Sequence, residues 1–228
     1  MKIAVIPARG GSKRIPRKNI KIFSGKPMIA YAIEASLASG IFDHVVVSTD
    51  DHEIKVIAEQ FGAQVPFERP AELADDHTPT VPVIEHAIKA CELLGWDIHA
   101  VCCVYPAVPF IKDDDLHAAL KLLEKSGAAY TFPVTEFSST IQRALKRNEN
   151  GTLNPFFPEY ELTRSQDLVP AYHDAGQFYW GWRESWFNNS RIHSSGVGLI
   201  IPNWRVVDID TNDDWIRAEM QYNVIKAL

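Results

Sequence analysis

Cysteine is scarce in this sequence of 228 residues, which has only Cys91, Cys102 and Cys103. Three cysteines cannot all pair, and two of them are adjacent within an apolar run. We therefore expect reduced, buried thiols in a cytosolic protein. CxxC and Cys/His spacings are absent as well, which argues against a metal site built on cysteine.

Long apolar runs are also missing. No stretch reaches the length of a membrane span, and the first residues, MKIAVIPA, have the character of a strand. A signal peptide would instead begin with a cationic segment followed by a longer apolar one. We therefore expect no signal peptide, no membrane contact and a cytoplasmic location.

An excess of positive charge is lacking too, because 23 Lys and Arg residues stand against 29 Asp and Glu residues, for a formal net charge of −6. Without a general basic field or a known nucleic-acid-reading motif, the sequence argues against a nucleic-acid partner. A polyanionic ligand must then be held by a local cluster of positive charge. Hydrophobic residues make up 46% of the chain, which is typical of a globular domain.

Apolar runs alternate with amphipathic segments along most of the chain. Runs rich in β-branched residues predict strands, and segments with a helical period predict helices between them. This alternation is typical of a Rossmann-like α/β fold, with a doubly wound, mostly parallel sheet that binds ligands beyond the carboxyl ends of its strands. The predicted strands are 2–7, 44–48, 64–67, 100–105, 128–134, 176–180, 198–201 and 206–209, and the predicted helices are 28–39, 53–61, 81–94, 113–126 and 213–228.

The alternation breaks down between about residues 135 and 172, where polar and aromatic residues mix with several prolines. We interpret this stretch as a small insertion of ribbon or loops in a single domain of residues 1–228. A contact between subunits is one role for such an insertion.

The loop after the first strand concentrates positive charge. Five cations and two adjacent glycines fall within residues 7–19, PARGGSKRIPRKN: Arg9, Gly10, Gly11, Lys13, Arg14, Arg17 and Lys18. Adjacent glycines let the backbone approach a ligand and present N–H groups to phosphate oxygens. Neither the GxxxxGK[ST] nor the GxGxxG spacing is present. A solvated basic loop is the alternative, but this charge density at the end of a strand favours a triphosphate site.

Two carboxylates stand close together near the end of the chain. A period of two places Asp208 and Asp210 on one face of the predicted strand 206–209 and its end. Two hard oxygen ligands at that spacing suit Mg²⁺, with phosphate oxygens and water completing an octahedron. Helix capping or exposure to solvent is the alternative.

An aromatic strand supplies candidates for a second, sugar-binding part of the site. Alternation places Gln177 and Tyr179 on one face of this strand, while Phe178 and Trp180 share the other. An ordinary buried aromatic strand is the alternative. The full set of candidates is Tyr105, His173, Asp174, Gln177 and Tyr179.

Several strings resemble the CMP-sialic acid synthetase family of cytidylyltransferases. They are IPARGGSKRIPRKN, GKPMIAYAIEAS, VVVSTDDHEI, RPAELA and the DID of residues 208–210, and they span nearly the whole chain in the family's order. The resemblance implies a fold of the nucleotide-diphospho-sugar transferase type and an enzyme that transfers CMP from CTP to a sugar acid with Mg²⁺. It also implies a homodimer in which the insertion reaches toward the partner's sugar site.

Three further strings look like the pseudaminic acid cytidylyltransferase branch of this family: VPFERP at 65–70, YPAVPF at 105–110 and YHDAGQFYWG at 172–181. Sialic acid enzymes generally have Gln-Pro-Thr-Ser-Pro where this chain has residues 105–109. The resemblance thus favours pseudaminic acid as the acceptor, for use in surface glycans or flagellin. Sialic acid, legionaminic acid, Kdo, or a non-catalytic nucleotide-binding protein on the same fold are the alternatives.

The resemblance also assigns roles to residues. It implies that the nucleotide is bound by Ala8, Arg9, Gly10, Gly11, Ser12, Lys13, Asn19, Arg69 and Thr80. It implies catalytic roles for Arg9, Lys13, Lys18 and Asp210, and metal binding by Asp208 and Asp210. Because no Ser/His/Asp or Cys/His set is evident, we expect direct transfer without a covalent enzyme intermediate.

Overall fold

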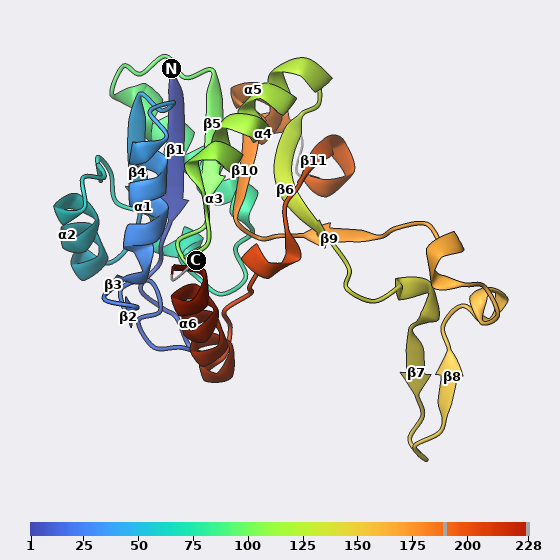
Figure 1. Cartoon of the computed structure of the whole chain (residues 1–228). Helices are drawn as coiled ribbons and strands as arrows, with labels where there is room; N and C mark the ends of the chain where they lie inside the picture. The colour runs from blue at the N-terminus through green and yellow to red at the C-terminus, as the bar shows by residue number, and fades with distance from the viewer. Residues whose placement is uncertain (189–190, 227–228) are drawn as a thin grey trace.

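The computed structural model describes residues 1–188 and 191–226, which form a seven-stranded central sheet flanked by helices (Figure 1). Its strands run in the order β11-β6-β10-β5-β1-β4, and β9 pairs with β6. They are β1 (Lys2–Pro7), β4 (His44–Ser48), β5 (Ala100–Val104), β6 (Tyr130–Glu136), β9 (Tyr172–Asp174), β10 (Phe178–Trp182) and β11 (Gly196–Ile200). The helices are α1 (Met28–Ala38), α2 (His52–Gln60), α3 (Thr80–Leu93), α4 (Asp113–Ser126), α5 (Arg183–Asn188) and α6 (Asn212–Lys226).

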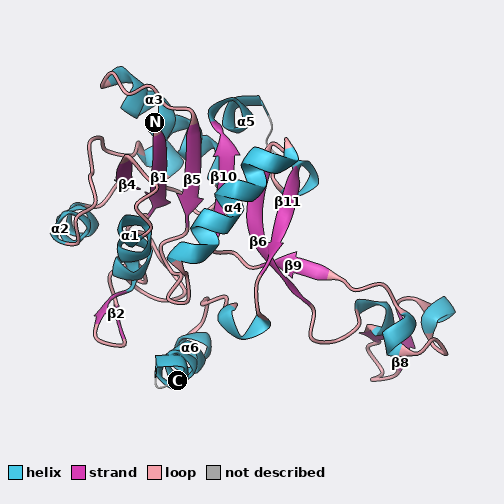
Figure 2. Cartoon of the chain, turned by 45° about the horizontal axis from the view of Figure 1, so that its top comes forward, coloured by secondary structure: helices cyan, strands magenta, loops and turns pink. Residues whose placement is uncertain are grey.

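The centre of the sheet consists of β4, β1 and β5, which run parallel to one another. Their sequences are almost entirely apolar because both faces of these strands are covered. Ala4 and Ile6 pack in the layer that contains α1, α2 and α4, whereas Ile3 and Val5 pack in the layer that contains α3 and α5. Figure 2 shows α1 and α4 crossing one face of the sheet. The predicted doubly wound α/β fold is therefore confirmed.

Strand β10 makes the sheet mixed, because it runs antiparallel to both β5 and β6. The chain enters β10 through a turn in which Gly176 has a φ of +62°, a conformation that favours glycine. Strand β9 is likewise antiparallel to β6, whereas β6 and β11 are parallel.

Two predicted strands are wrong. Residues 64–67 make only one isolated bridge, between Gln64 and Val46, before Pro66 removes the next backbone donor. Residues 206–209 pair with no strand in the described chain, although Val206 has an extended backbone. Their alternation reflects the burial of Ile209 against α6, not a place in the sheet.

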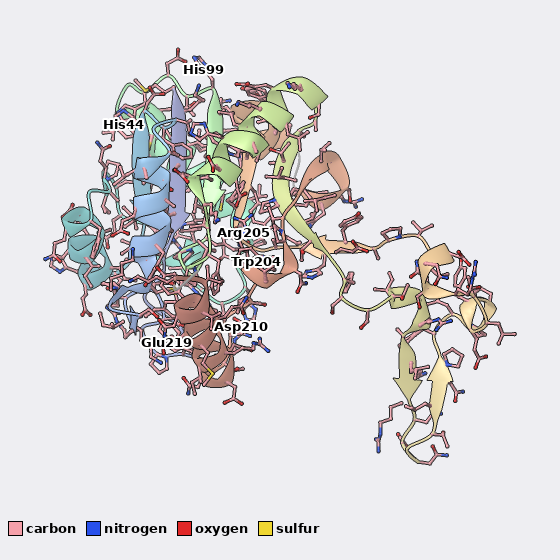
Figure 3. All side chains as sticks on the ribbon, in the orientation of Figure 1. His44, His99, Trp204, Arg205, Asp210 and Glu219 are labelled. Carbon is pink, nitrogen blue, oxygen red and sulfur yellow. The ribbon has the colours of Figure 1, made fainter. Side chains whose placement is uncertain are left out.

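Helix α6 closes the end of the domain where the strands terminate. Its Trp215 and Ala218 pack with Ile15, Phe23 and Ile209 in a third apolar cluster. Figure 3 shows Asp210 beside α6, at the opposite end of the molecule from His44 and His99. The predicted end of this helix, at residue 228, lies outside the described residues.

A long arm projects from the body between β6 and β9 (Figure 1). It carries the small ribbon of β7 (Leu145–Arg147) and β8 (Leu153–Pro155). Most of its residues are exposed, and the exposed apolar ones are Phe137, Ile141, Leu145, Leu153, Phe156, Phe157, Tyr160, Leu162 and Val169. This arm occupies the stretch in which the sequence predicts an insertion. Across the described parts of the chain, no helix is both long and apolar enough to cross a bilayer.

Candidate active site

A cavity of about 640 Å³ lies where β1 and β5 end. Its lining includes most of the predicted nucleotide and catalytic residues: Arg9, Ser12, Lys13, Lys18, Asn19, Arg69, Thr80 and Asp210, together with Tyr105. We call this space the first cavity. Ala8, Gly10, Gly11 and Asp208 belong to the same two loops but do not line it.

The basic loop is anchored at its start by β4. Ala8 is fully buried, and its N–H donates to the carbonyl of Ser48. The N–H of Gly10 donates to the carboxylate of Asp50 at 3.0 Å, so this donor is engaged within the protein. A Cβ at residue 10 would lie 2.6 Å from the carboxylate of Asp51. The close approach of the loop backbone to Asp51 therefore requires glycine.

Arg17 fastens the other end of the loop to α2. Its φ of +56° is unusual for a residue with a side chain, and its guanidinium binds Asp51 through two hydrogen bonds of 2.5 and 2.9 Å. Asp51 also caps α2 by accepting the N–H of Ile54. The hydrogen bond from Arg17 is the main reason why the pKa of Asp51 falls to about 2. Arg17 is therefore a structural cation that holds the N-cap of α2 in place.

Two loop cations meet a carboxylate from the segment before α3. Asp76 lies 2.7 Å from the guanidinium of Arg9 and also pairs with the ammonium of Lys13. The pKa of Asp76 is lowered, chiefly because Lys13 donates to it. A single carboxylate thus pairs with two of the cations that the resemblance assigns to the nucleotide.

Two other cations meet Asp210. Its carboxylate lies 2.6 Å from Arg14 and 3.4 Å from Lys18, whose ammonium also donates to the carbonyl of Ile209 at 2.8 Å. The first part of the basic loop therefore faces Asp76, and the second part faces Asp210.

Asp208 and Asp210 flank the buried Ile209, which is 2% exposed and fixes the segment between them. The pKa of Asp208 is raised, first by loss of hydration and second by the charge of Asp210. Such repulsion between carboxylates is what a bound cation relieves. Among the described residues no group of three or more His, Cys, Asp or Glu side chains is arranged to hold a metal. Mg²⁺ is usually bound by one or two carboxylates, with phosphate oxygens and water as its other ligands. The pair Asp208 and Asp210 therefore fits this ion.

Arg69 is only 4% exposed, so it is not a surface salt-bridge residue. Its guanidinium donates to the hydroxyl and the carbonyl of Ser48. Burial lowers the pKa of Arg69 to about 10. A buried guanidinium that lines a cavity and donates only to neutral oxygens of the described chain is well suited to bind a polar or anionic ligand.

Asn19 and Thr80 shape the cavity in different ways. The amide of Asn19 donates to the carbonyl of Arg9 at 3.0 Å and so holds the loop from behind. Thr80 begins α3, and its hydroxyl lies 2.9 Å from that of Tyr105, just after β5. Tyr105, a predicted sugar contact, is therefore held in place within the lining of the first cavity.

A second cavity, of about 530 Å³, adjoins the first, since Thr80 and Tyr105 line both. Its other lining residues are Pro79, Val81, Pro82, Glu85, Tyr179, Arg191, Ile192, His193 and Ser194. Of the predicted sugar residues, the structure brings Tyr105 and Tyr179 into this space. Asp174 lies next to it, where it accepts a hydrogen bond from the hydroxyl of Tyr179.

The other two predicted sugar residues line neither cavity. Gln177 is 4% exposed and donates to the carbonyl of Arg205, while His173 packs on Phe137 at the base of the arm. A sugar contact by either residue stays a prediction. His193 and Asp76 also line the cavities, although no role for either was predicted from the sequence. Tertiary contacts bring each of these residues to its cavity, so no local sequence pattern marks either of them as a site residue.

Comparison with known proteins shows the family to which this chain belongs. The sequence model of the family described as "Cytidylyltransferase" matches residues 3–181, which is most of the chain. The protein belongs to the cytidylyltransferase family, and it is therefore a nucleotidyltransferase.

Two relatives and one solved structure are similar to this chain over nearly its whole length. The chain is 43% identical to the pseudaminic acid cytidylyltransferase of Campylobacter jejuni, over 97% of this chain and 96% of the relative. It is 29% identical to the CMP-N,N'-diacetyllegionaminic acid synthase of Legionella pneumophila, over 95% and 94%. Its fold is similar to that of a CMP:2-keto-3-deoxy-manno-octonic acid synthetase solved in complex with CTP, with a TM-score of 0.70, 17% identity and coverage of 100% and 99%.

Proposed function

We propose that this protein transfers CMP from CTP to pseudaminic acid and releases pyrophosphate. The observation that carries the proposal is the first cavity, where Lys18 and Asp210 meet beside Arg9, Lys13 and the buried Arg69. The 43% identity to a pseudaminic acid cytidylyltransferase over nearly the full length of both chains supports the choice of acceptor.

In the proposed reaction, the C2 hydroxyl of the sugar acid attacks the α-phosphorus of CTP. A new O–P bond forms, the bond from the α-phosphorus to the bridging oxygen breaks, and the hydroxyl proton is lost to solvent. The protein contributes mainly position and charge. Arg9 and Lys13 would hold the departing phosphates, and Lys18 would balance charge at the reacting phosphate.

Asp208 and Asp210 are the residues that would hold Mg²⁺. When bound, the ion supplies positive charge to the phosphates and to the developing pyrophosphate. Asp210 would then bind the metal in place of its ion pairs with Arg14 and Lys18. Both cations would thus be available to the nucleotide. Because CTP is a cytoplasmic nucleotide, we place the reaction in the cytoplasm.

We also propose that the protein is a homodimer that uses its arm. The arm exposes nine large apolar side chains, none of which belongs to the apolar clusters of the described residues. Apolar side chains in such number are covered in stable proteins, and a second copy of the chain would cover them. The proposed contact brings the arm toward the partner's sugar site.

The nearest alternative acceptors are legionaminic acid, sialic acid and Kdo. The test is pyrophosphate release from CTP and Mg²⁺ with a panel of these acids and pseudaminic acid. Turnover confined to pseudaminic acid supports the proposal, and turnover with another acid overturns the choice of acceptor. Binding of CTP without turnover on any acid supports a non-catalytic nucleotide-binding protein instead.

A further inference from the structure

Residues 206–210, which we call the metal segment, carry both carboxylates proposed for Mg²⁺ but lie outside the sheet. Residues 206–209 pair with no strand in the described chain, so no ladder of backbone hydrogen bonds fixes their position. Figure 3 shows Arg205 near the end of the sheet and Asp210 further on, beside α6. The contacts at the two ends of the metal segment therefore determine where its carboxylates lie.

Arg205 fixes the start of the metal segment. Its guanidinium donates two hydrogen bonds, of 2.6 and 3.0 Å, to the two carboxylate oxygens of Asp115. The two side chains are only 6% and 14% exposed. Two parallel hydrogen bonds between charged planar groups set the orientation of the pair as well as its distance. The main-chain carbonyl of Arg205 also accepts the amide of Gln177, at 2.8 Å.

Asp115 is a firm anchor because the start of α4 is bonded to the sheet. The next residue, Leu116, is fully buried, and its carbonyl accepts the indole N–H of Trp180 on β10 at 3.1 Å. One turn further along α4, the carbonyl of Ala119 accepts the hydroxyl of Thr131 on β6 at 2.8 Å. The ion pair at Asp115 thus connects the metal segment to two strands of the central sheet.

The other end of the metal segment is held by the cap of α6. Asp214 accepts the N–H and the hydroxyl of Thr211, at 2.9 and 2.7 Å, and its own N–H donates to that hydroxyl at 3.2 Å. These reciprocal contacts have the form of a capping box. Asp214 also accepts the N–H of Asp210 at 3.3 Å. The cap fastens Asp210 to the start of α6, whereas Arg205 fastens the metal segment to the sheet.

We propose that Arg205 is a positioning residue, whose ion pair with Asp115 holds Asp208 and Asp210 in the arrangement that binds Mg²⁺. This inference rests on the proposed function. In the described part of the chain, Arg205 lines neither the first nor the second cavity, so it acts through the segment that it begins. A buried ion pair adds little to stability, because loss of hydration offsets the attraction between its charges. Orientation of the metal ligands is therefore the better explanation for this pair.

The test measures how tightly the protein–CTP complex holds Mn²⁺, which prefers the same oxygen ligands as Mg²⁺ and is detected by electron paramagnetic resonance. Protein is kept in excess over CTP, and no sugar acid is added. Arg205→Met should raise the dissociation constant of Mn²⁺ by about tenfold, as expected when a side chain that orients metal ligands is lost. Arg205→Lys keeps the charge and should recover part of the affinity.

Kinetics supply a second readout. In the complete reaction with pseudaminic acid, the Mg²⁺ concentration that gives half-maximal pyrophosphate release should rise with Arg205→Met by about the same tenfold factor. The kcat at saturating Mg²⁺ should change far less, because the metal ligands themselves are still present. A split of this kind indicates a change in metal binding, whereas a smaller folded fraction lowers the apparent kcat alone.

A double variant separates positioning from stability. Arg205→Met alone leaves the carboxylate of Asp115 buried without its partner, which lowers stability. The double variant Arg205→Met, Asp115→Leu removes both charges and should unfold at about the denaturant concentration of the wild type, since an apolar pair replaces the ion pair. Its affinity for Mn²⁺ should nevertheless stay as weak as that of Arg205→Met, because an apolar contact does not set orientation.

Arg183→Met is the matched control. Arg183 also forms two hydrogen bonds with one carboxylate, that of Glu92, at 2.7 and 3.1 Å. Its N–H donates to the carbonyl of His99, which Figure 3 places at the opposite end of the molecule from Asp210. This control loses a comparable ion pair and should bind Mn²⁺ as the wild type does.

The outcomes separate this inference from the proposed function. Folded Arg205→Met protein with the Mn²⁺ affinity of the wild type overturns the inference and leaves the function intact. A double variant that recovers Mn²⁺ affinity together with stability also overturns it, because the ion pair would then serve stability alone. A wild-type protein that binds Mn²⁺ but turns over none of the acids overturns the proposed function, and the Mn²⁺ affinities then decide the role of Arg205.

Discussion

The carboxylate of Asp210 lies 2.6 Å from the guanidinium of Arg14, although 196 residues separate the two in the chain. This contact joins the loop after the first strand to the segment before the last helix. It brings the two carboxylates that fit Mg²⁺ to the loop in which five cations are clustered. The site therefore combines segments from near both ends of the chain with residues from the middle of the sequence.

Asp210→Asn should lower turnover by about 100-fold or more, because the substitution removes one of the two charged ligands proposed for Mg²⁺. The rate of pyrophosphate release is measured across a titration of Mg²⁺. Asp213→Asn, at an exposed position three residues further along the chain, is the control and should retain activity. Near-normal Mg²⁺-dependent turnover of Asp210→Asn would remove this residue from the metal site.

Lys18→Ala should lower kcat by about 100-fold, since the ammonium would no longer balance charge at the reacting phosphate. Steady-state kinetics with CTP as the varied substrate check this expectation. Lys121→Ala, on the exposed face of α4, should have no effect. Unchanged kcat for Lys18→Ala would show that this residue acts outside the chemical step.

Asp76→Asn should tighten the binding of CTP by about threefold, because the phosphates would no longer compete with a carboxylate for Arg9 and Lys13. Calorimetric titration with CTP measures the change, which should shrink as salt is added. Asp97→Asn is the control, since Asp97 is 86% exposed and remote from both cavities. Weaker binding to Asp76→Asn would mean that Asp76 holds the loop in its binding conformation.

Stability should depend on Asp51 at low pH. Its pKa of about 2 lies below the ordinary value near 3.9, so the folded state favours the charged carboxylate. This contribution is complete above about pH 4 and is lost as the pH falls toward 2. Asp51→Ala should lower the free energy of unfolding at pH 7 by about 1–2 kcal/mol, through loss of the helix cap and of the pair with the partly exposed Arg17. Denaturant titrations at pH 7 and pH 3 check both the size and the sign, and the deficit of the variant should shrink at the lower pH.

Leu162→Glu should shift the protein from dimer to monomer if the arm forms the subunit contact. Leu162 is 96% exposed in one chain, and a carboxylate there would be buried at the cost of its hydration. Light scattering should give twice the 25.6 kDa of one chain for the wild type and a lower mass for the variant. Leu93→Glu, at a position 89% exposed on α3, serves as the control. A wild-type monomer would refute the proposed dimer.

The sequence predicts the centre of the fold well because β1, β4 and β5 are buried on both faces and therefore read as unbroken apolar runs. It does not reveal that β10 is antiparallel, since its direction depends on the turn at Gly176 and on the neighbours it finds. The segment 206–209 has the alternation of a strand for another reason, the burial of Ile209 against α6.

The site, like the fold, has parts that the sequence predicts and parts that depend on tertiary contacts. The loop after β1 is predictable because charge and glycine are concentrated in one short stretch. The separate roles of its cations are not, because Arg17 is drawn to Asp51 and Arg14 to Asp210 by contacts between distant segments. His193 reaches the second cavity through a hydrogen bond to Asp174, 19 residues earlier, and no local pattern marks it.

Phosphorus NMR of the complete reaction follows the transfer of CMP from CTP to a sugar acid without an indirect readout. With protein, CTP, Mg²⁺ and pseudaminic acid, we expect loss of the CTP signals, appearance of pyrophosphate and one new phosphodiester signal, all dependent on the acid. Formation of CDP and inorganic phosphate, or release of free CMP at the same rate without the acid, would contradict it.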